Sequence, residues 1–361
     1  MKLHWFFKFL IVTATLIFLG LSFYFGLPRV LPTQNVKDSE VYGLILSDQV
    51  WSGEIRVIGD IFSPTNSTVI VLPGTKIIVA IKGDKSNMDF LPWHRKSGIN
   101  TGPFTKGVNH SEPFWDEAQK IQIHLNELRV FGNFASPVSF SSDSDNPSAY
   151  DFNVLSIRGG RINNGIFSNY RRFEIGGDTV ISNSAFRDTG ECSLCLSRGK
   201  PRIENSRFER SLRESVWVQR ASPEIVNNLF QNLLGEGIKV DAKRLSVPII
   251  TDNSFEMPGR TAIDLVSGGQ LNEGLIARNS FSGNSEIKIA CDSNIRIRDN
   301  VISGSVSFTS GCAGGFTFGP NYWGSPDVRV ILAEKILNKN NTFKIEIPTV
   351  LIIPPKDAGR K

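Results

Sequence analysis

The sequence contains few of the residues that build metal and redox centres. It has 4 histidines, 4 cysteines and 3 methionines among 361 residues. Only His94, His110 and His124 lie beyond the first few residues, and no H-x-H or H-E-x-x-H spacing occurs. The single C-x-x-C, Cys192 to Cys195, lacks the second pair that would complete a zinc site. We therefore predict no cofactor, with calcium left open for the acidic segments described below.

The sequence also lacks a cluster of positively charged residues. The chain has 40 Lys and Arg against 35 Asp and Glu, a formal net charge of +5, and no block of basic residues. A hydrophobic content of 40% and a charged content of 21% are typical of a folded chain. Nucleic-acid binding would require a basic stripe or patch, so we predict no nucleic-acid partner.

Long hydrophobic runs are missing too, with one exception near the N-terminus. Residues 9–27 form 19 consecutive uncharged residues, which as a helix would rise about 28 Å, close to the thickness of the bilayer core. Lys2 and Lys8 precede this run, so the positive-inside rule places the N-terminus in the cytoplasm. We predict a single-pass membrane anchor with the bulk of the chain extracytoplasmic, at the cell surface. The alternative is a cleaved signal peptide and a secreted protein.

What the sequence does contain is a repeat with a period near 22 residues. Aligned on an aromatic or aliphatic anchor, successive units are separated by 19, 22, 22, 25, 26 and 21 residues. The anchors are Phe167, Phe186, Phe208, Phe230, Phe255, Phe281 and Ile302. Isoleucine stands five residues before each anchor, asparagine recurs two or three residues before it, and a short alternating strand follows eight to ten residues after it. Periods of 20–50 residues are typical of solenoids.

Each unit holds short strands and too few apolar residues to form a core alone. Stacking the units would bury the isoleucine and phenylalanine columns in one interior, with parallel strands about 4.8 Å apart. Asparagine tolerates the left-handed backbone of a sharp bend, and stacked amides can bond from unit to unit. The leucine-rich repeat and propeller patterns are absent. The pattern therefore predicts an all-β fold, a parallel β-helix.

At these residues the chain resembles the right-handed parallel β-helix proteins of the pectate-lyase-like superfamily, and within them the NosD type of bacterial surface or periplasmic protein. The stretches 51–79 and 128–142 resemble entry coils, and 319–327 resembles the close of the helix. The resemblance covers about 42–355 and implies fold more than function, because one fold hosts many activities. We predict a tip, anchor and linker at 1–41, a β-helix at 42–325 with an inserted loop at 82–120, and a C-terminal cap and tail at 326–361.

The inserted loop is the first candidate site, because it combines aromatic, imidazole and carboxylate groups. Such a loop could stack sugars and hold calcium or perform acid–base chemistry; a polar surface loop pinned by its aromatics is the simpler interpretation. Its candidate residues are Trp93, His94, His110, Trp115, Asp116 and Glu117.

The outward side of the strand after each anchor is the second candidate site. Trp217, Lys239, Asp241 and Asp264 could line a groove for an extended polymer. Enzymes of the resembling superfamily use calcium-binding aspartates with a basic residue, or paired carboxylates, on such a face. Here the acids look scattered, so a solvated face is the simpler interpretation.

The cysteines are interpreted as structural. Cys291 and Cys312 both lie ten residues after their anchors, so we predict that they stack in one column and form a disulfide. Cys192 and Cys195, three residues apart on a strand, should point to opposite faces, one to the core and one to the surface.

Taken together, these patterns favour a non-catalytic protein that binds polysaccharide or a cell-envelope partner. The alternative is an enzyme acting on polysaccharide, a lyase, glycoside hydrolase or epimerase. A structural envelope protein without a glycan ligand is the third hypothesis.

Overall fold

The computed structural model divides the chain into two units, Met1–Thr33 and Gln34–Lys361. The residues described are 33–64, 66–81, 120–241, 246–266, 271–290, 293–309, 316–337, 344–356 and 358–359. The predicted membrane segment 9–27 lies outside them. Within the described part of the chain, no helix has the length and apolar character needed to cross a bilayer.

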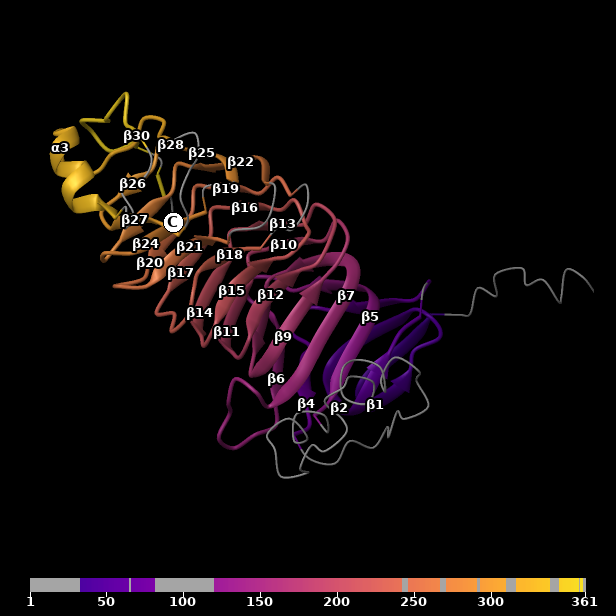
Figure 1. The fold of residues 1–361 in the computed structure, drawn as a ribbon. Coiled ribbons are helices and arrows are strands. Elements are labelled where there is room, and N and C mark those ends of the chain that lie inside the picture. Colours follow the sequence, from indigo (N-terminus) through magenta and orange to yellow (C-terminus); the bar gives the residue numbers. More distant parts are fainter. Residues whose placement is uncertain are drawn as a thin grey trace, which may run out of the picture. The chain divides into compact units, whose positions relative to one another are not determined.

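The first coils are built from long strands, and the sheet begins at Gln34, ahead of the predicted boundary at residue 42. β1 pairs in parallel with β2, so part of the expected linker is already a rung of the sheet. The strands of this region are β1 (Gln34–Leu44), β2 (Gln49–Phe62), β3 (Thr68–Val71), β4 (Lys76–Val79), β5 (Gln122–Phe131) and β6 (Val138–Ser142). Figure 1 shows them in indigo to magenta at one end of the stack.

From β7 (Phe152–Asn163) onward, each coil contributes an isoleucine strand, a phenylalanine strand and a third strand, all paired in parallel with the next coil. The isoleucine strands are the end of β7, β10 (Val180–Ser182), β13 (Arg202–Glu204), β16 (Glu224–Val226), β19 (Ile249–Thr251), β22 (Leu271–Ala277) and β25 (Ser293–Arg298). The phenylalanine strands are β8 (Gly165–Ser168), β11 (Ala185–Thr189), β14 (Arg207–Ser211), β17 (Leu229–Gln231), β20 (Ser254–Glu256), β23 (Ser280–Ser282) and β26 (Val301–Ile302). The third strands are β9 (Tyr170–Ile175), β12 (Cys192–Leu196), β15 (Glu214–Val218), β18 (Ile238–Val240), β21 (Thr261–Leu265), β24 (Glu286–Ile289) and β27 (Ser305–Phe308).

The predicted vertical columns are present in the core. Ile203 pairs with Ile225 and Ile225 with Ile250, and all three side chains are fully buried. The phenylalanine rings of neighbouring coils stack nearly parallel, with centroids 4.7 Å apart for Phe208 and Phe230 and 4.8 Å for Phe230 and Phe255. The period of the sequence is therefore the period of the coil, and like side chains pack on their own kind.

The recurring asparagines form two ladders rather than one. The outer ladder lies at the bend between the isoleucine and phenylalanine strands, where the residues adopt positive φ, 51° at Asn205 and 55° at Asn227. The inner ladder is the next residue along the chain and is buried: Asn228, Asn253, Asn279, Asn300 and Asn321. In the inner ladder each amide oxygen accepts from the backbone N–H of the preceding rung at 2.9–3.0 Å. These bonds satisfy the bend's polar backbone inside the core.

One inward pair differs from the sequence expectation. The spacing placed Ile289 and Cys291 at the inward positions of β24, but Ile287 pairs with Ile263 and Ile289 with Phe308. Ile287 lies six residues after its anchor Phe281, whereas Ile263 lies eight residues after Phe255, so the offset from the anchor shifts by two. Cys291 and Cys312 lie outside the described residues, so their disulfide stays a prediction.

The C-terminal segment covers the last coil with short elements. These are β28 (Phe316–Thr317), α3 (Val328–Val330), the π-helix η1 (Ile331–Lys335), β29 (Ile336–Leu337) and β30 (Ile345–Glu346). β29 pairs with β27, while β28 and β30 form a separate small sheet. Trp323 is fully buried, and its ring meets Phe318 edge-on with centroids 5.3 Å apart. This segment shields core side chains of the last coil, as a cap does.

Candidate functional site

The outer side of the third strands carries one continuous column of side chains. In β15, Val216 and Val218 point into the core, so Trp217 between them points outward. Strand pairing sets its neighbours: Cys195 before it, then Lys239, Asp264 and Lys288 after it. Three of the predicted site residues, Trp217, Lys239 and Asp264, are therefore brought into one file.

Acidic side chains from the start of the same strands and the turns before them flank this column. Glu214 opens β15, Glu236 precedes β18 and Glu286 opens β24. We call the combined set the charged strip: Glu214, Trp217, Glu236, Lys239, Asp264, Glu286 and Lys288. It spans four successive coils.

Lys239 connects three carboxylates of the charged strip. Its Nζ donates to Glu214 Oε1 at 3.0 Å and lies 3.7 Å from Glu236 Oε2. Burial by itself lowers the pKa of Lys239, but the bond to Glu214 and the charges of Glu236 and Asp264 together raise it. The ammonium form is thus favoured, and Glu214, with only 9% of its side chain exposed, has a compensating charge.

Two carboxyl groups of adjacent coils meet beside Lys239. Glu236 and Asp264 interact across adjacent coils, and the pKa of each is raised, first of all by burial. The charge of Asp264 raises the pKa of Glu236 further, whereas Lys239 and Lys288 act in the opposite direction on Asp264. Two such groups hold a proton between them more readily than isolated carboxyls do.

The far end of the charged strip is more loosely paired. Lys288 Nζ lies 3.9 Å from Glu286 Oε2, and Ser307 Oγ donates to the other oxygen of Glu286. The Lys288 side chain is 32% exposed, against 25% for Lys239. The charges at this end are therefore open to a ligand as well as to water.

Trp217 gives the charged strip its apolar surface. The ring is half-buried, and its Nε1–H is enclosed without a hydrogen-bond partner. An unpaired indole donor next to carboxylates costs free energy unless a ligand or water accepts its proton.

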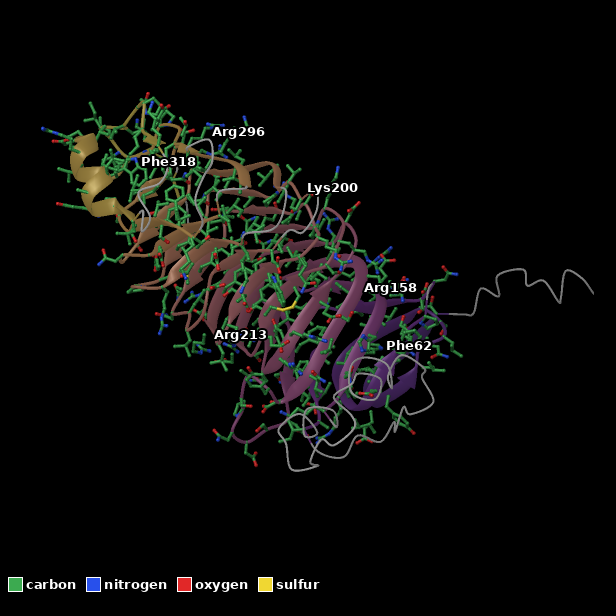
Figure 2. The ribbon with its side chains drawn as sticks, in the orientation of Figure 1. Phe62, Arg158, Lys200, Arg213, Arg296 and Phe318 are labelled. Atoms are coloured by element: carbon green, nitrogen blue, oxygen red, sulfur yellow. A yellow bond between two sulfur atoms is a disulfide. The ribbon has the colours of Figure 1, made fainter. Side chains whose placement is uncertain are left out.

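Cys192 and Cys195 overturn the prediction that they face opposite sides. They form a disulfide with a Cα–Cα distance of 5.7 Å, and both are buried. The physical reason is a β-bulge: the step from Cys192 to Cys195 pairs with the shorter step from Arg172 to Glu174. The extra residue turns both sulfurs to the outer side, directly beside Trp217. Figure 2 draws the bridge as a yellow bond among the middle coils.

The remaining predicted residues divide into two groups. Asp241 follows the last residue of β18, so it lies in a turn and not in the column; its backbone N–H donates to Val218 O at 2.8 Å. The loop candidates Trp93, His94, His110, Trp115, Asp116 and Glu117 all lie outside the described residues.

Sequence reasoning missed two acidic residues of the charged strip, Glu214 and Glu286. They stand at different offsets from their anchors, because the turns before β15 and β24 differ in length.

The same outward column extends toward the N-terminus beyond the charged strip. There Phe62, His124 and Ser156 follow one another, and a small groove forms between them and Arg158. Figure 2 labels Phe62 and Arg158. Among the described residues, no group of three or more His, Cys, Asp or Glu side chains is placed to hold a metal ion.

Part of this chain matches a known protein family. Residues 136–273 match the family described as right handed beta helix region. No curated protein and no solved structure matches the chain. The matched segment contains β12, β15 and β18, and with them Trp217 and Lys239.

Proposed function

The chain is a right-handed parallel β-helix repeat protein, and on that premise we propose that it is a non-catalytic binding protein for a neutral polysaccharide outside the cytoplasm. The observation that supports this most is the charged strip. Trp217 offers an apolar ring beside a row of fixed hydrogen-bonding groups, at a repeat of about 4.8 Å set by the strands. An extended sugar chain along the coils would meet equivalent positions in succession.

The charge of the strip favours neutral sugars over polyuronates. Glu214, Glu236, Asp264 and Glu286 supply four carboxyl groups, and Lys239 and Lys288 supply two ammonium groups. Even with one proton shared by Glu236 and Asp264, the balance is negative, which repels an anionic polymer. Ionised carboxylates are good acceptors for sugar hydroxyls.

Titration of the full chain with neutral and uronate oligosaccharides tests this proposal. Trp217→Ala should lower the affinity for the neutral ligand by about tenfold, since roughly 1.4 kcal/mol of ring contact is lost. Lys200→Ala is the control, because Lys200 is exposed in the turn between β12 and β13. Equal affinity of Trp217→Ala and the parent for every neutral glycan, or tighter binding of polyuronate, would contradict the proposal.

The enzyme alternative has one observation in its favour, the Glu236 and Asp264 pair with raised pKa values. One consideration weighs against it: a lysine with a raised pKa, such as Lys239, is a poor general base for a lyase.

Product analysis separates the two functions. Incubation with neutral and uronate polymers should release neither reducing ends nor unsaturated products. Release that Glu236→Gln abolishes would instead establish the enzyme.

The proposal also includes the anchor at residues 9–27 and the kinship with pectate-lyase-like and NosD-type proteins. Protease added to intact cells should remove a C-terminal tag while leaving an N-terminal tag protected. Recovery of the whole chain from the medium would favour the cleaved signal peptide.

A further inference from the structure

The outer asparagine ladder is interrupted at one position. Asn183 Nδ2 donates to Asn163 Oδ1 at 3.0 Å, and Asn227 Nδ2 donates to Asn205 Oδ1 at 2.6 Å. The bond that would join the two pairs, from Asn205 to Asn183, is not made. Within the described coils, Asn205 Nδ2 and Asn183 Oδ1 have no hydrogen-bond partner. The interruption leaves one free donor and one free acceptor about one strand spacing apart.

A groove lies at this interruption. It is lined by Asn183, Asn205, Ser206, Arg207, Asn227, Asn228, Leu229 and Ser254. Asn227 also lines the groove, but its Oδ1 is enclosed beneath the surface without a hydrogen-bond partner. The groove is on the bend between the isoleucine and phenylalanine strands, so it shares no residue with the charged strip.

The composition of the inner ladder explains why there is space for the groove. Asn228 fills its rung and donates Nδ2 to Ile203 O at 3.0 Å. One coil earlier the rung is Ser206, whose shorter side chain donates to Glu204 O instead. Because this rung is a serine and not an asparagine, the corner lacks one side-chain amide, which leaves space beside the outer ladder.

The unpaired groups match one chemical class. A secondary amide has a carbonyl that accepts a hydrogen bond and an N–H that donates one. Its carbonyl can accept from Asn205 Nδ2, and its N–H can donate to Asn183 Oδ1. The methyl of an acetamido group can then rest on Leu229, the aliphatic side chain of the lining.

We propose that this groove binds the acetamido group of an N-acetylated amino sugar. The site is independent of the charged strip and of the neutral-polysaccharide function proposed for it. A carboxylate ligand fits less well, because the guanidinium of Arg207 is already bonded to Glu209.

Calorimetric titration of the full chain in detergent micelles tests the site with two probes, the N-acetylglucosamine trimer and the glucose trimer of the same linkage. The acetylated trimer should bind about tenfold more tightly, as expected of one or two additional neutral hydrogen bonds. Asn205→Gly removes the amide donor and keeps the positive φ, so it should abolish that preference.

Asn232→Gly is the matched control. Asn232 also has positive φ, 51°, but it is exposed on another bend and does not line the groove. This variant and Trp217→Ala should both keep the preference for the acetylated trimer. Equal affinity of the two trimers, a preference that survives Asn205→Gly, or a preference lost in Trp217→Ala would each overturn the proposal. Loss of neutral-glycan binding in Trp217→Ala with the acetamido preference retained separates the two sites.

Discussion

The N-terminal coils and the repeat coils build the same columns from different residues. Val71, Val130 and Ile162 occupy one column, and Ile77, Phe140 and Phe167 occupy another. The strands of the first coils reach 14 residues in β2, whereas the isoleucine strands β10, β13 and β16 have 3 residues each. Asparagine ladders occur only in the second group among the described residues.

The difference indicates what fixes register in each region. A long strand has many backbone hydrogen bonds, so its core side chains can vary among Trp, Ile, Val and Leu. A three-residue strand has few backbone hydrogen bonds. Its register therefore depends on identical side chains that stack from coil to coil, ring on ring and amide on amide. Substitutions in the stacks, in the ladder and at the contacts between coils test that account.

The phenylalanine stack should give the largest loss of stability. Phe230→Ala removes a fully buried ring that stacks on Phe208 and Phe255, and should lower the free energy of unfolding by about 3–5 kcal/mol. Phe134→Ala is the matched control in the first coils, since Phe134 is 99% exposed and should change stability by less than about 0.5 kcal/mol. Denaturant unfolding measures both. Equal effects would mean that the stack is not what holds the short strands.

Breaking the inner asparagine ladder should cause the second-largest loss of stability. Asn253→Ala removes an amide that accepts from the Asn228 backbone and donates to Ile225 O and Thr251 O, leaving these groups buried without partners. The expected loss is about 3 kcal/mol, at 1–3 kcal/mol for each unsatisfied group. Asn232→Gly should be nearly neutral because its side chain is exposed. A much smaller loss in the free energy of unfolding for Asn253→Ala would show that water replaces the ladder at little cost.

The disulfide should have an intermediate effect. Replacing Cys192 and Cys195 together by serine opens a loop of only a few residues, so the loss in stability should be about 2 kcal/mol. Reductant should lower the melting temperature of the parent to about that of the double variant, and it should leave the melting temperature of the double variant unchanged. If the double variant still responds to reductant, the predicted bridge between Cys291 and Cys312 is present as well.

The carboxyl pair should give the smallest effect, and a gain. Burial raises the folded pKa values of Glu236 and Asp264 above their unfolded values, and the charge of Asp264 raises that of Glu236 further, so the pair loses stability as pH rises through those folded values. Asp264→Asn removes one charge and can donate to Glu236. It should therefore stabilise the protein by roughly 0.5 kcal/mol at pH 7 and by less at pH 4.

Melting curves across this pH range check the pair, with Asp241→Asn as the control outside the charged strip. A gain that is the same at both pH values, or that Asp241→Asn reproduces, would rule out the repulsion.

The same contrast explains which parts of the architecture were predictable. Where phenylalanine and asparagine recur, the period alone located the coils. Phe140 stacks on Phe167 with centroids 4.7 Å apart, yet the repeat pattern does not include it, because Ala135 stands five residues before Phe140 where the later units have isoleucine. Gln34 was assigned to the linker for a related reason: β1 is largely exposed and lacks the apolar alternation of a buried strand.

The candidate site was only half predictable. Alternation along a strand placed Trp217, Lys239 and Asp264 outward, since successive side chains point to opposite faces. The bulge at Cys192 and Cys195 breaks that rule, and nothing in the spacing signals it. The pairing of Glu236 with Asp264 depends on turn lengths in two coils, which vary without a pattern.

The amino-acid sequence by itself determined that this chain winds into a stacked parallel coil, because short strands of fixed period can bury their apolar columns only against copies of themselves. Tertiary structure alone decided which polar groups of different coils meet, as with the carboxyls beside Lys239 and the unjoined amides of Asn183 and Asn205. Those encounters are set by the lengths and bends of the turns, and a shift of one or two residues there moves a side chain to another neighbour or another face.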